Sequence, residues 1–150
     1  MTTNFYSSVG QAIALLAASP YHQQFALESY LRIEIIPAIE QDLTLIYQTE
    51  NGTPYALVTY AWVSAAVLYE LKTTGRALRK DEWRSGETLF INDFIVPYGD
   101  IKKVMKNLCG EVFADHIAFS LRRDMDGNVR KVQRLHGKSY MRDRCRKDVA

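Results

Sequence analysis

Apolar residues near the start of the chain recur three and four positions apart. Over residues 5–18 this spacing predicts a helix that ends at Ser19-Pro20. A second helix is predicted from Pro20 towards Arg32, because serine is a favoured N-cap and proline a favoured first helical residue. The segment RIEIIPAIE at 32–40 is predicted to be extended and apolar, broken by its proline.

The rest of the chain alternates between extended and helical patterns. The predicted elements follow in this order: strands at 42–49 and 55–62, a helix at 63–75, a loop at 80–87, a strand at 88–99, a helix at 100–113, and strands at 116–124 and 129–137. Asn51-Gly52 predicts a tight hairpin turn, and Gly75 and Asp100 are predicted helix caps. After Gly137 the pattern fits either a frayed end or a helix. This order predicts one domain over residues 1–150 of the α/β (α+β) class, with helices flanking a mostly antiparallel sheet.

Composition places the chain among globular proteins with a substantial core. It has 150 residues, and no apolar run approaches the roughly 20 residues that span a bilayer. The segment AIALLAAS at 12–19 resembles the core of a signal peptide, but the first basic residue is Arg32, so we expect no signal and a cytoplasmic protein. Cys109 and Cys145 have no paired spacing and are expected to be reduced.

The small net charge of +2 hides an uneven distribution. Residues 122–150 hold ten Lys and Arg against four Asp, whereas residues 1–121 hold nine basic against thirteen acidic side chains. A basic segment attracts anionic partners such as nucleic acid, an acidic protein or an anionic membrane surface. The alternative is a solvated strand pair followed by a loose basic tail at 137–150.

Two residues carry the chemistry that the sequence suggests. His22 falls in the first turn of the predicted second helix, where the positive end of the helix dipole disfavours an imidazolium ion, so a neutral ring can accept a proton. Asp93 lies inside the apolar run FINDFIVP, where a carboxylate is costly without a partner and can orient a histidine. The alternatives are an ordinary exposed histidine and an aspartate that caps a turn. His116 and His136 are weaker candidates.

Two glycine-containing loops are the remaining candidates. WRSGE at 83–87 either walls a groove or anchors a loop on the core, and VPYGD at 96–100 leads into a helix whose first N–H groups can hold an anion. The sequence has no P-loop, GxGxxG, HExxH, CxxC or GxSxG motif, and nothing in it indicates a metal. It also lacks the Gly-rich loop that grips the pyrophosphate in CoA-dependent N-acetyltransferases.

Five blocks, in order, resemble the RTX toxin-activating lysine acyltransferases, the haemolysin-activating proteins of Gram-negative bacteria. The likeness runs from about Gly10 to about Gly137. The blocks are LLAASPYH, IIPAIEQDLTLIY, GTPYALVTYAWVS, DEWRSGETLFINDFIVPYGD, and AFSLRRD with KVQRLHGK. The fourth is the most specific, because it is similar to the family's Trp-x-Ser-Gly motif followed by Asp-aromatic-Ile-Ala-Pro-aromatic-Gly.

This resemblance implies a fold like that of the Gcn5-type N-acyltransferases and a homodimer. It implies transfer of a fatty acyl group from acyl carrier protein to internal lysines of an RTX protoxin, with no tightly bound cofactor. The family's catalytic residues fall on His22 and Asp93. The residues expected to bind the substrate or the acyl donor are Ser19, Trp83, Ser85, Gly86, Pro97, Gly99 and Arg122.

The chemistry of lysine acylation agrees with these assignments. A lysine amine has a pKa of about 10.4 and must lose a proton before it attacks a thioester. His22 would accept that proton, and the basic C-terminal part would steer an acidic carrier protein. Direct attack by lysine is expected rather than an acyl-enzyme, because no cysteine or serine has a clear base beside it in the sequence.

The chain departs from the family pattern at three positions. Glu34 stands where the family usually has asparagine, and a carboxylate cannot donate the hydrogen bonds that an amide donates. Val96 and Tyr98 replace the usual alanine and phenylalanine, mild changes near a possible acyl pocket. Three alternatives remain: a CoA-dependent Gcn5-like enzyme acting on another amine, an inactive relative, and a basic module that binds nucleic acid through residues 122–147.

Overall fold

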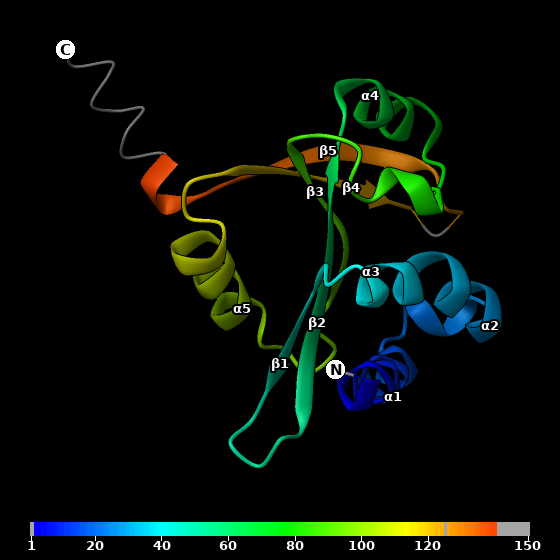
Figure 1. Cartoon of the computed structure of the whole chain (residues 1–150), viewed down its shortest axis with the longest axis vertical. Helices are drawn as coiled ribbons and strands as arrows, with labels where there is room; N and C mark the ends of the chain where they lie inside the picture. Colours follow the sequence, from blue (N-terminus) through cyan, green and yellow to red (C-terminus); the bar gives the residue numbers. More distant parts are fainter. Residues whose placement is uncertain (1, 125, 141–150) are drawn as a thin grey trace.

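The computed structural model describes residues 2–124 and 126–140. They form one open five-stranded sheet with helices packed on both of its faces (Figure 1). The strands are β1 (Thr44–Gln48), β2 (Pro54–Val63), β3 (Thr88–Ile95), β4 (Ile117–Arg123) and β5 (Val129–His136). They lie in the sheet in the order in which they occur in the chain. Every neighbouring pair is antiparallel except β3 and β4, which run parallel. The predicted α+β class, the mostly antiparallel sheet and both hairpins are therefore confirmed.

Three of the predicted helices are present. They are α1 (Thr2–Ala18), α4 (Ala65–Thr74) and α5 (Ile101–Asn107), the last continued by a π turn, η4 (Leu108–Val112). Ser64 caps α4 by accepting a hydrogen bond from the Val67 N–H at 3.2 Å, and Gly75 ends it in the left-handed conformation with φ 69°. Asp100 stands at the N-cap of α5, but its side chain makes no capping hydrogen bond. The loop at 80–87 contains one short 3-10 turn, η3 (Lys80–Glu82).

The predicted second helix and the predicted extended segment after it are both wrong. The chain instead forms η1 (His22–Gln24), α2 (Leu27–Tyr30), a π turn η2 (Leu31–Ile35) and α3 (Ile36–Glu40). The short helix η1 ends after three residues because Phe25 and Ala26 adopt extended backbone angles. Pro37 does not break α3, because it lies in the first turn of that helix, where its missing N–H is not needed.

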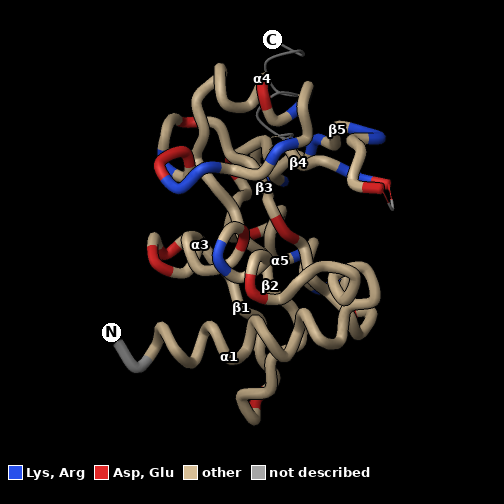
Figure 2. Tube along the Cα trace, turned by 90° about the vertical axis from the view of Figure 1, so that its right-hand side faces the viewer, with Lys and Arg blue, Asp and Glu red and all other residues tan. Residues whose placement is uncertain are grey.

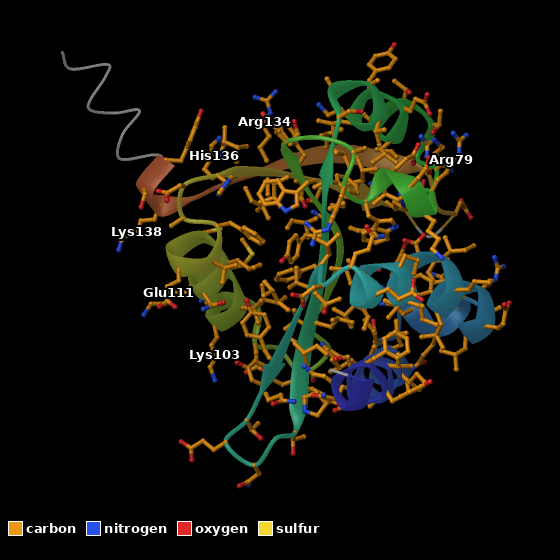
Figure 3. All side chains as sticks on the ribbon, in the orientation of Figure 1. Arg79, Lys103, Glu111, Arg134, His136 and Lys138 are labelled. Atoms are coloured by element: carbon orange, nitrogen blue, oxygen red, sulfur yellow. The ribbon has the colours of Figure 1, made fainter. Side chains whose placement is uncertain are left out.

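The helices cover the two faces of the sheet unequally. One face, called the η1 face here, is covered by α1 to α3, α4 and the short helix η3. The opposite face, called the α5 face, is covered by α5 and its π turn (Figure 1). Figure 3 shows Lys103 and Glu111 pointing outward from this helical segment, while Val104 and Leu108 are buried against the strands. The central strands β2 and β3 are therefore buried on both faces.

A β-bulge interrupts the pairing of the two central strands. Between two consecutive residues of β2, the partner on β3 jumps from Asp93 to Ile91, so Asn92 is an extra residue. Side chains along a regular strand alternate between faces, and Asp93 would then share the α5 face with Ile91. With the bulge, Asp93 and Ile95 lie on the η1 face instead, where Ile95 packs against α1.

The C-terminal end is described only in part. Residues 138–140 form a helical turn after β5, whereas 141–150, most of the predicted basic tail, lie outside the described residues. Within residues 2–124 and 126–140, no helix is long and apolar enough to cross a membrane.

Gly86→Ala is expected to destabilise the fold. A Cβ atom at this position would lie 2.5 Å from the Ser64 backbone and 2.5 Å from the Val63 carbonyl oxygen. Relief of that overlap should lower the free energy of unfolding by about 1–3 kcal/mol. Gly10→Ala is the matched control: among the described residues, nothing lies within 4 Å of its Cβ, and alanine inside a helix is favoured over glycine by about 0.5–1 kcal/mol. Urea unfolding measures both, and equal effects would contradict the prediction.

Candidate active site

His22 and Asp93, 71 positions apart in the chain, are in contact. The Nε2 atom of His22 lies 3.3 Å from Oδ1 of Asp93, and each side chain is 8% exposed. The histidine is carried by the short helix η1 and the aspartate by β3 just past the bulge. The bulge is what makes the contact possible, because it puts the carboxylate on the face of the sheet that η1 covers.

The second ring nitrogen of His22 is held by a neighbour in the same turn. Ser19 Oγ lies 2.6 Å from Nδ1. An ionised carboxylate only accepts hydrogen bonds, so in the neutral ring Nε2–H donates to Asp93 and Nδ1 accepts from the Ser19 hydroxyl. The helix that the sequence predicts around His22 is replaced by η1, which has three residues, and the Ser19 hydroxyl bonds to the ring instead of capping a backbone N–H. Two side chains hold the imidazole in its place.

Sequence reasoning missed a tyrosine that completes this cluster. The Tyr30 hydroxyl donates to the same Asp93 Oδ1 at 2.5 Å, and its ring stands edge-on to the His22 ring at 5.4 Å between centroids. Burial, reinforced by the Asp93 charge, raises the pKa of Tyr30 far above its usual range, so the hydroxyl keeps its proton and stays a donor. Nothing in the sequence signals this contact, because 63 positions separate the two residues.

Asp93 is fixed from behind, and one of its carboxylate oxygens is unpaired within the described part of the chain. Its backbone N–H donates to Oγ1 of Thr59, a buried residue of β2, at 3.0 Å. Its second carboxylate oxygen, Oδ2, is buried and has no hydrogen-bond partner within the described part of the chain. An unpaired buried acceptor costs about 1–3 kcal/mol, so this oxygen favours the arrival of a donor.

A second carboxyl group lies near the first. Glu34, carried by the π turn η2, accepts a hydrogen bond at 2.7 Å from the side chain of Asn92, the bulge residue. Burial, together with the negative charge of Asp93, raises the pKa of Glu34 above its ordinary value of 4.5. The residue that departs from the family pattern therefore lies within the candidate site.

These groups line a cleft of about 930 Å³. Strands β3 and β4 pair over only three residue pairs, the last of them Ile91 with Ser120, and beyond that point the cleft lies between them. Its residues on the η1 face include His22, Tyr30 and Glu34; α5 contributes Ile101 and Met105 from the other face, and the end of β4 contributes Arg122 and Arg123. The cleft is thus bordered by elements from both faces of the sheet.

The structure brings some of the predicted site residues together and leaves others apart. Arg122 lines the cleft, and Ser19 contacts His22 from outside the cleft lining. The remaining five, Trp83, Ser85, Gly86, Pro97 and Gly99, are not among the cleft-lining residues. Their expected roles in binding substrate or donor stay predictions.

The WRSGE segment anchors a loop on the core. Trp83 is fully buried in the core beneath α4. The Ser85 hydroxyl donates to the Glu82 carbonyl at 2.8 Å and accepts from the Ser64 N–H at 3.2 Å. Pro97 and Gly99 form the turn from β3 into α5, and Gly99 has φ 89°. The WRSGE segment thus holds the start of α4, and the turn at 97–99 joins β3 to α5, two elements that line the cleft.

The polar order Ser19–His22–Asp93 matches that of a serine hydrolase triad. The sequence showed no serine with a clear base beside it, whereas the structure places His22 next to Ser19. A nucleophilic serine must reach its substrate, but Ser19 is 8% exposed and is not among the residues that line the cleft. Its contact with Nδ1 therefore suits a positioning residue better than a nucleophile. No group of three metal-binding side chains occurs within residues 2–124 and 126–140.

Comparison with known proteins connects this geometry to one family. The model of the RTX toxin acyltransferase family matches residues 1–136. The chain is 31% identical over 105 residues to a lysine-acyltransferase of Vibrio cholerae, covering 70% of this chain and 68% of the relative. It is 28% identical over 134 residues to the RTX-I toxin-activating lysine-acyltransferase of Actinobacillus pleuropneumoniae, covering 89% and 76%. It is 27% identical over 131 residues to a protein-lysine myristoyltransferase of Escherichia coli, covering 86% and 72%.

The stability difference between Glu34→Gln and the wild-type protein is expected to depend on pH. The folded wild type holds its Glu34 proton to a higher pH than the unfolded chain does, so its stability falls as pH rises from 4.5 through the raised pKa. Glutamine carries no such proton, and the variant therefore gains stability relative to wild type over that interval. Urea unfolding across the pH range measures the difference.

Glu82→Gln serves as a control of opposite sign. Hydrogen bonds from Arg76, at 2.8 Å to each carboxylate oxygen, lower the pKa of Glu82 below 4.5. The wild type therefore loses stability relative to this variant as pH falls below 4.5. A difference for Glu34→Gln that stays flat with pH would contradict the assignment of a buried, proton-retaining carboxyl group.

Proposed function

Because the chain belongs to the RTX toxin acyltransferase family, we propose that it transfers a fatty acyl group from acyl carrier protein to internal lysine side chains of an RTX protoxin and so activates it. The observation that carries the proposal is the buried contact between His22 and Asp93 beside a cleft large enough for two substrates. A cytoplasmic enzyme with no tightly bound cofactor would meet the carrier protein and the newly made protoxin there.

His22 is the proton acceptor in this proposal. His22 lines the cleft, and once the Ser19 hydroxyl turns away from Nδ1, this ring nitrogen accepts a proton from the substrate amine, whose nitrogen attacks the thioester carbonyl carbon. The carbon–sulfur bond then breaks, and the carrier's thiolate takes up the proton held by the imidazolium ion and leaves as a thiol. The imidazolium ion that forms is stabilised by Asp93 on the other ring nitrogen. Ser19 orients the ring, and the lysine attacks directly.

The charges around the cleft suit the two substrates. Glu34 and the unpaired oxygen of Asp93 offer acceptors to a lysine ammonium group on the η1 face. Arg122 and Arg123 stand at the end of β4 and suit the phosphate of the carrier's phosphopantetheine arm. Figure 2 shows further Lys and Arg positions along β5, a surface that would steer an acidic carrier protein.

The sheet supports a more specific fold assignment, that of the Gcn5-type N-acyltransferases. A parallel pair that separates after three residue pairs leaves the backbone edge of β3 unpaired beside the cleft. An extended pantetheine arm can hydrogen-bond to such an edge as another strand would. The missing pyrophosphate loop favours a donor delivered by its own protein over free acyl-CoA. The proposal extends to a single catalytic domain and to a homodimer.

Intact mass spectrometry tests this function directly. The wild-type protein, mixed with acylated carrier protein and a candidate RTX protoxin, is expected to add one or two acyl masses to lysines. His22→Ala and Asp93→Ala should each lower the rate by about 10²–10⁴-fold, the usual contribution of general acid–base catalysis. His136→Ala is the control, since this histidine lies on β5 and packs against Tyr140. Faster transfer from acyl-CoA than from acyl carrier protein would overturn the choice of donor.

Tyr30→Phe is expected to lower kcat by about 10–100-fold with little change in KM for the protoxin. The substitution keeps the ring against His22 and removes one hydrogen bond to a charged acceptor, a loss of about 1.5–3 kcal/mol. Asp93 then attracts the imidazolium ion more strongly, so the acidic limb of the pH–rate profile should move to higher pH.

Tyr21→Phe is the matched comparison for that variant. Tyr21 also stands edge-on to the His22 ring, at 5.0 Å, but within the described residues Asp93 receives its tyrosine hydrogen bond from Tyr30. A pH–rate profile that moves equally in both variants would show that the hydroxyl of Tyr30 has no special role.

A further inference from the structure

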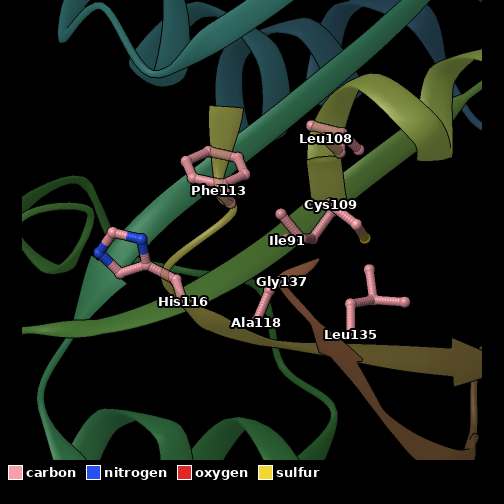
Figure 4. Close-up of a pocket in the computed structure, with 8 residues that line it drawn as sticks. All are labelled: Ile91, Leu108, Cys109, Phe113, His116, Ala118, Leu135 and Gly137. Atoms are coloured by element: carbon pink, nitrogen blue, oxygen red, sulfur yellow. The ribbon is translucent and has the colours of Figure 1, made fainter. Parts of the chain in front are cut away.

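A small second pocket lies on the α5 face of the sheet (Figure 4). Its volume is about 10 Å³, enough for roughly one water molecule or one methyl group. Its walls are formed by Ile91, Leu108, Cys109, Phe113, His116, Ala118, Leu135 and Gly137. Apart from the edge of one histidine ring, the side chains around it are apolar or weakly polar, so the pocket suits a hydrocarbon group better than a polar one.

The pocket and the main cleft are neighbours. Ile91 of β3 and Leu135 of β5 line both of them. Between the two, side chains of α5 and of its π turn η4 form a stripe: Ile101 and Met105 face the cleft, and Leu108 and Cys109 face the pocket. Positions separated by four, seven and eight residues fall on one side of a helix. An apolar surface therefore runs from the cleft to the pocket.

The local geometry of α5 keeps this stripe facing the sheet. The helix changes to a π turn at Leu108, so Leu108 and Cys109 both reach the pocket. Such turns are common at functional sites in helices. Charged residues of the same helical segment, Lys103 and Glu111, point away from it (Figure 3). The stripe is therefore free of charge along its length.

We propose that this face of α5 and η4, formed by Ile101, Met105, Leu108 and Cys109, binds the fatty acyl chain of the donor, and that the small pocket at its end sets the preferred chain length. This inference rests on the proposed function. The reacting groups, His22 and Asp93, belong to the η1 face. A thioester held between β3 and β4 would therefore place its carbonyl near the histidine and its chain along α5.

The energetics make chain length a sensitive measure of this site. Each methylene group buried from water contributes about 0.8 kcal/mol, which is about a fourfold change in binding. A pocket with room for one methyl group accepts the last carbon of a fitting chain and excludes a longer one. Changing the volume of the wall should therefore move the preferred length rather than alter all donors equally.

Two substitutions change the volume of the proposed acyl site in opposite directions. Met105→Ala removes side-chain volume between the cleft and the pocket and should move the preferred donor to a longer chain by two carbons or more. Ala118→Val adds volume to the pocket wall and should move the preference to a shorter chain. The measurement is kcat/KM for carrier proteins loaded with saturated chains that differ by two carbons.

Val104→Ala is the matched control. Val104 lies on the same helix and is fully buried, but it lines neither the cleft nor the pocket. Val104→Ala, like Met105→Ala, removes side-chain volume from this helix. It should therefore lower the stability of the protein without moving the chain-length preference. Equal shifts in the two variants, or no shift in either, would overturn the proposal.

A second measurement does not depend on turnover. In a Cys145→Ser background, a bound chain that follows the stripe should slow the alkylation of Cys109 at least several-fold. The probes are carrier proteins that carry a long saturated chain or an acetyl group, and only the first should protect. Burial raises the pKa of Cys109, so the reaction is run at alkaline pH.

The two measurements separate failure of this inference from failure of the proposed function. Protection of Cys109 by the long chain, with no transfer to the protoxin from any donor, would support the acyl site and overturn the proposed reaction. Transfer by the wild-type protein, with neither protection of Cys109 nor a change of preference in Met105→Ala, would leave the function intact and overturn the acyl site.

Discussion

The candidate site depends on one extra residue in the central strand β3. Asn92 shifts the side-chain alternation by one position, so Asp93 lies on the η1 face instead of the face that α5 covers. A one-residue slip moves every later side chain of a strand to the other face. Here the slip serves two purposes: Ile95 stays in the core against α1, and the carboxylate meets His22. The bulge residue itself also takes part, because its side chain holds Glu34.

In the proposed reaction, the same region would let one cleft serve chemically different substrates. The parallel pairing of β3 and β4 ends next to the bulge, and the strands that follow border an opening lined from both faces. Acidic groups and the histidine lie on one side of it, arginines at the end of β4, and an uncharged helix face on the other side. An enzyme that joins a lysine to a fatty acyl group needs those three environments within reach of one reacting centre.

The site also shows what a buried polar cluster requires. His22 and Asp93 are both almost fully buried, which is favourable only when their polar atoms are satisfied. Ser19 and Tyr30 supply hydrogen bonds to the ring and the carboxylate, and Thr59 holds the backbone behind them. One carboxylate oxygen is left without a partner among the described residues. In the proposed reaction, this oxygen would accept a hydrogen bond from the substrate.

The sequence by itself determined the sheet, its hairpins and most helices, because periodicity and turn residues such as Asn51-Gly52 and Gly75 act locally. It also singled out His22 and Asp93, since each is unusual in its own segment. It failed where tertiary contacts override local preference: Ser19 bonds to the histidine ring instead of capping a helix, and the apolar stretch after it folds as helical turns under burial. Only the tertiary structure decided which face Asp93 occupies and which side chains meet it, because a bulge and contacts across dozens of residues depend on how the elements pack together.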